Sequence, residues 1–263
     1  MTGLLLMTAL AWATEPVVEK VESGHIDWSS MVLQVTARGD RTVGAWKGRA
    51  IQEADALGRL EPMLLEAARA IRVYPGTRAE VLLEADPLNN ANIIRQLDDG
   101  LRKQIVWRVS ETRYLSGGGV EMDAELDLYA WLRPALMARA KGQPQPPSPE
   151  GQTGLLIDAR HLAFRPCVAP EVHLSDGTVF FGATALSTQT AGAQTPVVYV
   201  SDPAAPKASA RAGSQPEFLT AESSTGRCTL VLSEQDSKIL PERAGVTGWL
   251  STGRVVIVAG ADS

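Results

Sequence analysis

An unbroken alternation of apolar and acidic residues in the middle of the chain constrains the fold most. Residues 120–128 read Val-Glu-Met-Asp-Ala-Glu-Leu-Asp-Leu, so every even position is apolar and every odd position is acidic. Successive side chains of a β-strand point to opposite faces of a sheet, and this period of two predicts a strand with one buried face. The chain is therefore expected to contain at least one sheet that covers a core on one side.

The segment 107–115 is also strand-like and is joined to the acidic strand by the sequence Ser-Gly-Gly-Gly. A glycine-rich connection between two strands predicts an antiparallel hairpin. We expect Leu115 to lie opposite Val120 and Arg108 opposite Asp127, because this register places the apolar residues of both strands on one side.

Two helices are predicted before this hairpin. Apolar residues recur at helical spacing between residues 50 and 71 and again from about residue 88 to residue 105. Pro62 lies inside the first pattern and predicts a kink or a break there.

The region around residues 140–153 is rich in Pro, Gly, Gln and Ser, and it predicts an extended linker without a core of its own. It separates a first domain, residues 14–139, from a C-terminal domain, residues 154–263. The second domain is expected to be rich in β-structure. It contains several short apolar runs and a predicted hairpin, whose turn is formed by Asp176 and Gly177.

The N-terminus predicts export. Residues 3–13 are uncharged and apolar, but they are too few for a membrane-spanning helix, which needs about 20 residues. Ala11 and Ala13 fit a signal-peptidase site, so residues 1–13 are interpreted as a signal peptide and Thr14 as the mature N-terminus. A buried N-terminal strand is the alternative. No Cys follows the cleavage site, so lipid anchoring of the lipoprotein type is not expected.

The chain contains two cysteines, Cys167 and Cys228. In an oxidising compartment such a pair can form a disulfide. Two buried free thiols are the alternative, since free Cys is among the most buried residue types.

No pattern in the chain predicts catalysis. The carboxylates of the acidic strand alternate as on a solvated sheet face, and the three histidines show no metal-binding spacing. The nucleophile-elbow and phosphate-loop motifs are missing, and the formal net charge of −5 argues against a nucleic-acid binder. We therefore expect no catalytic residue, no metal site and no cofactor. The residues set aside on these grounds are Glu121, Asp123, Glu125, Asp127, His25, His161 and His173.

The segment 153–182 contains an apolar strand that ends in Ile-Asp-Ala-Arg, followed by spaced prolines and an Asp-Gly turn. With this pattern it resembles bacterial envelope proteins of the flagellar assembly protein T type and relatives of the small twenty-kilodalton outer-membrane lipoprotein family. The first domain, with the sequence VTARG followed by an alanine-spaced helix, resembles the lipoprotein-like domain of the same group. The resemblance implies a periplasmic, non-enzymatic component of an envelope assembly. The residues that carry the resemblance are Ile157, Asp158, Ala159, Arg160, Leu162, Pro166, Ala169, Pro170, Asp176 and Gly177.

The motif Ile-Asp-Ala-Arg-His-Leu could border an active site, but we interpret it as structural. In this interpretation Asp158, at the end of a strand, accepts hydrogen bonds from nearby backbone N–H groups or forms a buried pair with Arg160 or Arg165. His161 is expected near the surface. The predicted class is α+β, with two small domains that each contain a mostly antiparallel sheet and helices on one side. The expected function is a periplasmic or secreted interaction protein whose partners are other envelope proteins, and an oligomer is possible. The alternative function is a periplasmic module that binds a small molecule or a cell-wall fragment.

Overall fold

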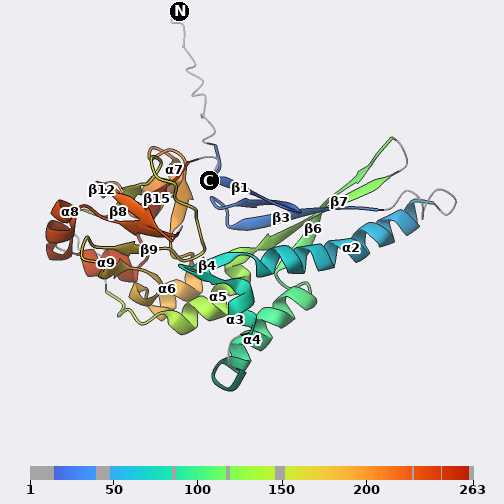
Figure 1. The fold of residues 1–263 in the computed structure, drawn as a ribbon, viewed down its shortest axis with the longest axis horizontal. Helices are drawn as coiled ribbons and strands as arrows, with labels where there is room; N and C mark the ends of the chain where they lie inside the picture. Colours follow the sequence, from blue (N-terminus) through green and yellow to red (C-terminus); the bar gives the residue numbers. More distant parts are fainter. Residues whose placement is uncertain are drawn as a thin grey trace, which may run out of the picture.

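The computed structural model describes residues 15–39, 48–84, 87–116, 119–145, 152–226, 228–243 and 245–260. The predicted signal peptide, residues 1–13, lies outside these ranges. No helix within the described part of the chain is both long and apolar enough to cross a membrane. The α+β class and the division into two domains are confirmed, with helices and sheets in both halves of the molecule (Figure 1).

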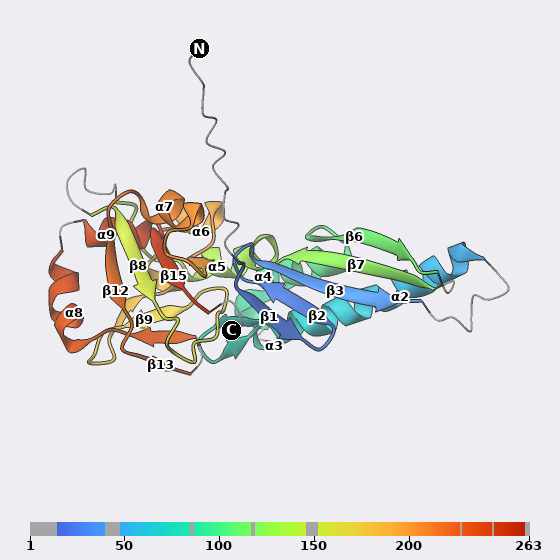
Figure 2. The ribbon, with the colours of Figure 1, turned by 90° about the horizontal axis from the view of Figure 1, so that it is seen from above.

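The first domain contains a five-stranded antiparallel sheet with helices on one side, as predicted. The strand order is β1-β2-β3-β7-β6. Figure 2 shows the other face of the sheet free of helices, with α2 behind it. The strands are β1 (Val18–Val21), β2 (Gly24–Asp27), β3 (Val32–Arg38), β6 (Trp107–Tyr114) and β7 (Val120–Asp127).

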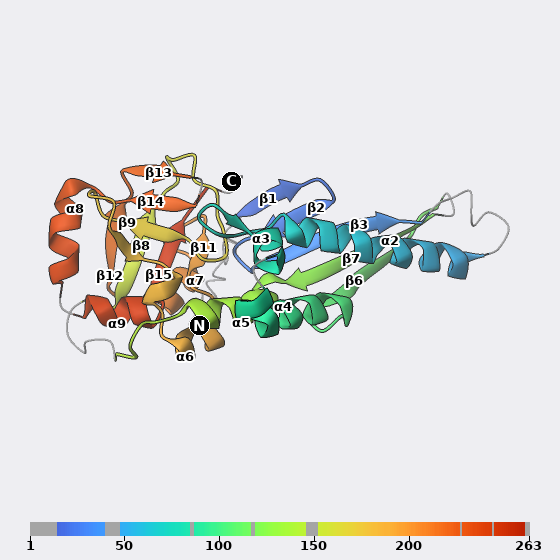
Figure 3. The same cartoon turned by 60° about the horizontal axis from the view of Figure 1, so that its bottom comes forward.

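The covering helices are α2 (Arg49–Arg69), α3 (Ala79–Glu84), α4 (Pro87–Arg102) and α5 (Leu128–Arg139), and they lie on one side of the sheet (Figure 3). The apolar stripe of α2 packs on the sheet through residues such as Leu60 and Leu64, which are buried. Pro62 lies inside α2 without dividing it, so of the two predicted outcomes, a kink or a break, the break is not observed.

The predicted hairpin of β6 and β7 exists, but its register differs from the expected one. Tyr114 pairs with Val120, and Trp107 pairs with Leu126 after a bulge between Val109 and Glu111. The bulge is required because the apolar residues of β6 occupy odd positions at its start and even positions at its end. Because of the extra residue, Trp107 at one end of β6 and Tyr114 at the other both lie opposite apolar residues of β7.

Helix α5 was not predicted. The acidic strand ends at Asp127, whose side chain caps the helix by accepting a hydrogen bond from the Ala130 amide at 2.8 Å. An Asp before an apolar run is an N-cap signal, and the alternation of the strand up to this position conceals it.

The C-terminal domain contains a four-stranded sheet in which all pairings are parallel, in the order β11-β15-β8-β12. The mostly antiparallel sheet expected for this domain is therefore corrected. The physical reason is visible in the sequence for β8, β11 and β15, because these three strands are largely apolar runs, which are typical of strands buried on both faces. The strands are β8 (Gly154–Asp158), β11 (Val198–Val200), β12 (Pro216–Thr220) and β15 (Val255–Val258).

Structure covers both faces of this parallel sheet. Helix α7 (Pro206–Ala212) packs on one face, where Leu156 and Val256 contact its alanines. Leu155 and Ile157 point to the opposite face and pack in the main core with helices α6 (Thr188–Ala193) and α9 (Val246–Ser251). Figure 1 shows α7 above the sheet and α6 and α9 below it.

A second, mixed sheet of four strands completes this domain, in the order β10-β9-β14-β13. The predicted hairpin around Asp176 and Gly177 is confirmed by the antiparallel pairing of β9 with β10. The strands are β9 (Glu171–His173), β10 (Val179–Phe181), β13 (Ser223–Thr225) and β14 (Thr229–Val231), and the remaining helices are η1 (Ala183–Ala185), α8 (Glu234–Ile239) and η2 (Leu240–Glu242).

The two domains share one continuous cluster of buried apolar residues. Strand β4 (Arg72–Tyr74), which pairs with β5 (Thr77–Arg78), also bonds to the second domain: the amides of Val168 and Ala169 donate to the Arg72 and Val73 carbonyls at 3.1 and 2.9 Å. The start of the predicted linker is docked as well, since the Gly142 amide donates to the Leu186 carbonyl at 2.8 Å. The domains therefore pack as one body.

Candidate functional site

The motif at residues 154–162 forms β8, at an inner position of the parallel sheet, and the turn that follows it. Ile157 is fully buried and Ala159 nearly so. One Asp158 oxygen accepts hydrogen bonds from the Arg160 amide at 3.1 Å and Nε at 2.9 Å, and the other accepts from Nη2 at 2.6 Å. The predicted pairing of Asp158 with Arg160 is therefore present, and it closes the turn locally.

This ion pair is not buried, which corrects the expectation. The side chain of Asp158 is 15% exposed and that of Arg160 is 46% exposed. The hydrogen bonds from Arg160 hold the pKa of the Asp158 carboxyl below its usual range, although partial burial opposes the shift. His161 is exposed, as expected.

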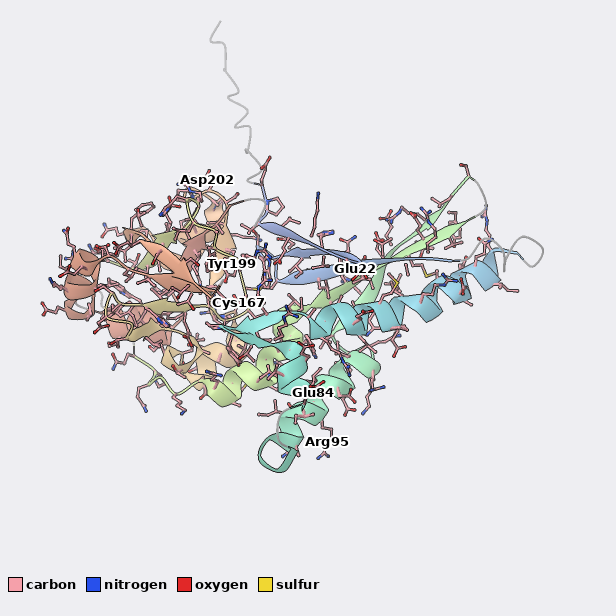
Figure 4. All side chains as sticks on the ribbon, viewed as in Figure 1. Glu22, Glu84, Arg95, Cys167, Tyr199 and Asp202 are labelled. Carbon is pink, nitrogen blue, oxygen red and sulfur yellow. A yellow bond between two sulfur atoms is a disulfide. The ribbon has the colours of Figure 1, made fainter. Side chains whose placement is uncertain are left out.

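The structure joins Cys167 and Cys228 in a disulfide, with their Cα atoms 5.9 Å apart. The hydroxyl of Tyr199 donates to the Cys167 carbonyl at 2.8 Å and accepts from the Cys167 amide at 3.3 Å. Burial raises the pKa of Tyr199, so this phenol stays protonated at physiological pH. Figure 4 shows Cys167 and Tyr199 close together at the side of the second domain that faces the first.

A group of polar and aromatic side chains connects this disulfide region to the first domain. Arg72 donates from Nε to the Pro166 carbonyl at 3.0 Å and forms an ion pair with Glu19. Glu19 also accepts from the indole N–H of Trp28 at 3.0 Å, and the Trp28 ring meets Tyr199 edge-on at 6.2 Å. We call Glu19, Trp28, Arg72, Cys167 and Tyr199 the junction cluster.

Sequence reasoning did not identify Glu19 or Arg72. One signal was present, because Glu19 on β1 alternates with Val21 on the same strand and with Val17 just before it. A carboxylate in the apolar phase of a strand needs a partner, since an unpaired buried charge is costly. Which distant residue supplies that partner, here Arg72 on β4, is decided by the tertiary structure and is not visible in the sequence.

The other residues of the resemblance lie apart from the junction cluster. Asp176 accepts a hydrogen bond from the Thr178 amide at 2.8 Å, and Gly177 has a φ of 84°, which favours glycine. Pro170 is buried just before β9. These three residues shape a hairpin, and the structure does not bring them together with Asp158 into a single site.

The four carboxylates of β7 are paired more closely than a solvated face implies. Asp123 accepts from Arg113 at 2.5 and 2.9 Å, from Thr36 at 2.8 Å and from Gln34 at 3.2 Å, and its side chain is only 3% exposed. The bonds from Arg113 hold the pKa of Asp123 below its usual range. Glu121 pairs with Arg38 and Arg113, Glu125 pairs with Arg108, and Asp127 caps α5.

The described residues contain no group of three or more His, Cys, Asp or Glu side chains that fits a metal ion. His173 forms a hydrogen bond with Glu171 at 2.9 Å on β9, and His25 is partly exposed on β2. The carboxylates of Glu121, Asp123 and Glu125 on β7 are paired with arginines of β3 and β6.

A pocket of about 390 Å³ opens between α3, α4, α5 and η1. It differs from the surfaces described above because apolar and cationic groups share its wall. The lining residues are Tyr74, Leu82, Ile93, Ala135, Ala138, Arg139, Lys141 and Thr184. Thr184 belongs to the second domain, so the pocket lies at the junction of the two domains.

Residues 154–261 match a family model described as the second domain of Tp0624 from Treponema pallidum. The match begins at β8, where the second domain was predicted to begin. It covers less than half of the chain, and it is a similarity of the second domain alone. No curated protein matches the chain.

Proposed function

We propose that this chain is an exported, non-catalytic interaction protein of a bacterial envelope assembly. The proposal agrees with the sequence resemblance to proteins of the flagellar assembly type. The disulfide between Cys167 and Cys228 supports an oxidising compartment, because structural disulfides are rare in reducing ones.

The observation that carries the interaction role is the outer edge of the five-stranded sheet. Strand β6 has no neighbour beyond it within the described chain. Ile105 lies just before this strand and is 69% exposed, and Val109 on it is 39% exposed. Tyr114, at the end of the strand, is 51% exposed and donates a hydrogen bond to Glu53 of α2. An open strand edge with apolar side chains is suited to pairing with a strand of another protein. We therefore assign the partner surface to β6.

The test is co-purification after crosslinking in envelope fractions of the native cell. The double variant Ile105→Glu, Val109→Glu places charges on the exposed edge and is expected to lose the crosslinked partner. The matched control is Val179→Glu, Ile239→Glu, at positions in the second domain that are 48% and 43% exposed. The control is expected to keep the partner. Equal recovery with both variants would contradict the assignment to β6.

A second candidate function, binding of a small molecule, is favoured by the pocket at the junction. Its volume lies in the range of about 300–1,000 Å³ that is typical of small-ligand sites. Equilibrium dialysis of the folded protein against the ligand class inferred below tests this function separately from partner binding.

A further inference from the structure

We infer that the pocket between α3, α4, α5 and η1 binds a small amphiphilic anion, with its charged group at Arg139 and Lys141 and its apolar body against the aliphatic wall. The inference develops the second candidate function and does not depend on the partner surface at β6. The ligand class follows from the size of the pocket, its wall and its charge.

The wall of the pocket suits a short apolar chain. Leu82 comes from α3, Ile93 from α4, and Ala135 and Ala138 from α5. Because Ala135 and Ala138 are small, a space remains between α5 and the aliphatic side chains of α3 and α4. A volume of about 390 Å³ admits a ligand of small-molecule size and is too small for a partner helix.

The polar groups of the pocket are cationic or neutral. The guanidinium of Arg139 lies 4.4 Å from the centre of the Tyr74 ring, and the Tyr74 hydroxyl donates to the Ala135 carbonyl at 3.3 Å. Burial raises the pKa of Tyr74 to about 12, so the ring that supports Arg139 remains uncharged. Stacking on Tyr74 holds Arg139 in place and leaves its N–H groups available for a ligand.

Lys141 adds a second positive charge on the same rim. Its backbone amide donates to the Thr184 carbonyl at 3.2 Å, which fixes the position of this residue against η1. Neither Arg139 nor Lys141 forms an ion pair with a carboxylate in the ranges that the structure describes, whereas most other arginines of the first domain do. Two such cations beside an apolar pocket are complementary to a carboxylate or phosphate with an apolar tail.

The first experiment measures binding of decanoate to the folded protein by isothermal titration calorimetry at neutral pH, below the micelle concentration. We expect saturable binding of decanoate and at least tenfold weaker binding of decanol and of decyltrimethylammonium, because loss of one charged hydrogen bond costs about this factor. Equal binding of the three compounds, or no saturable binding of decanoate, would overturn the inference.

Variants then locate the site. Arg139→Gln is expected to weaken decanoate binding about tenfold. Arg133→Gln, which removes an exposed positive charge from α5 outside the pocket lining, is expected to leave binding unchanged. Ala138→Trp fills the pocket at an exposed position and is expected to abolish binding while the melting temperature stays that of the wild type. Unchanged binding in Arg139→Gln or in Ala138→Trp would overturn the location.

A final arm distinguishes a small amphiphile from the end of a protein chain. An apolar tripeptide with a free C-terminal carboxylate is expected to compete weakly with decanoate. If the tripeptide binds more tightly than decanoate, the assignment to a small amphiphile is wrong. Partner recovery by the Ala138→Trp variant is expected to equal that of the wild type, so failure at this pocket and failure of the β6 surface give different results.

Discussion

In β3 of the first domain, buried Leu33, Val35 and Ala37 alternate with the polar residues Thr36 and Arg38, which are exposed. In β15 of the second domain, all residues of Val255–Val258 are buried. The first sheet separates a core from an open face that carries paired charges. The second sheet lies between two packed layers. This difference explains why paired charges occupy inner strands of the first sheet, whereas in the parallel sheet charged side chains occur at the end of β8, at Asp158, and on the edge strand β12, at Glu217.

The disulfide gives the largest expected difference between the two domains, because both of its cysteines lie in the second. A loop of 61 residues is closed by this bond, and the loop-entropy model assigns it about 4 kcal/mol of stability. We expect the double variant Cys167→Ala, Cys228→Ala to lower the free energy of unfolding by about this amount. Denaturant titration of both proteins checks it.

Hydrogen exchange on the same variant sharpens the comparison. Protection should fall in β8 and β15 and also in β4, since β4 bonds directly to Val168 and Ala169. If β4 keeps its full protection while the second domain loses it, the shared core does not couple the two domains.

The next largest effect tests whether the second sheet is buried on both faces. Leu156 and Ile157 are adjacent in β8 and point to opposite layers. Substitution of either by Ala is expected to cost about 3 kcal/mol. In β3, Leu33→Ala should cost a similar amount, whereas the neighbouring Gln34→Ala should cost about 1 kcal/mol or less. If Gln34→Ala and Leu33→Ala destabilised the protein equally, the first sheet would not differ from the second in having only one buried face.

A smaller effect is expected at the most enclosed charge of the open face. Asp123→Asn weakens the bonds to Arg113 and should lower stability by about 1–2 kcal/mol at neutral pH, a value limited because Arg113 is partly exposed and water can replace the carboxylate. Glu125→Gln, whose partner Arg108 is 78% exposed, serves as the control and should leave the melting temperature nearly unchanged.

The pH dependence of this effect has a defined sign. Bonds from Arg113 lower the pKa of Asp123 in the folded state, so its stabilising contribution is complete above the ordinary carboxyl pKa of 3.8 and is lost as the pH falls below it. Thermal melts between pH 7 and pH 2 should therefore show the wild type and Asp123→Asn converging at low pH. A constant difference across this range would contradict the assignment.

The smallest effect is expected at the strand end of the second domain. Because Arg160 is half exposed, Asp158→Ala should cost less than about 1 kcal/mol, far less than a buried pair. His161→Ala should be silent in thermal melts, since this side chain is exposed. A loss of several kcal/mol in Asp158→Ala would show that the turn after β8 contributes more to the second domain than its exposure implies.

Local patterns predicted much of the fold. Periodicity predicted the acidic strand and the helices around Pro62 and Leu97. Turn residues predicted the hairpin at Asp176 and Gly177. The errors share a physical origin. The register of β6 depends on a bulge, and the parallel pairing of the second domain depends on layers that cover both faces of its sheet. Apolar runs indicated strands that are buried on both faces, but such a run does not specify which other strand pairs with it.

The candidate sites were less accessible to prediction than the fold. Tyr74 and Arg139 are 65 positions apart in the sequence, yet they stack in one pocket. Glu19 and Arg72 likewise meet across the junction. Neither pair belongs to a spacing motif, because each is created by packing between elements that are distant along the chain.

The sequence by itself determined the α+β class and the positions of most elements, because side-chain periodicity, turn residues and helix caps act over a few neighbouring residues. Tertiary structure alone decided the parallel order of the second sheet, the joining of two domains through β4, and the cationic pocket at Arg139. Those features depend on which apolar faces cover one another, and that choice minimises exposed apolar area over the whole molecule rather than within any one segment.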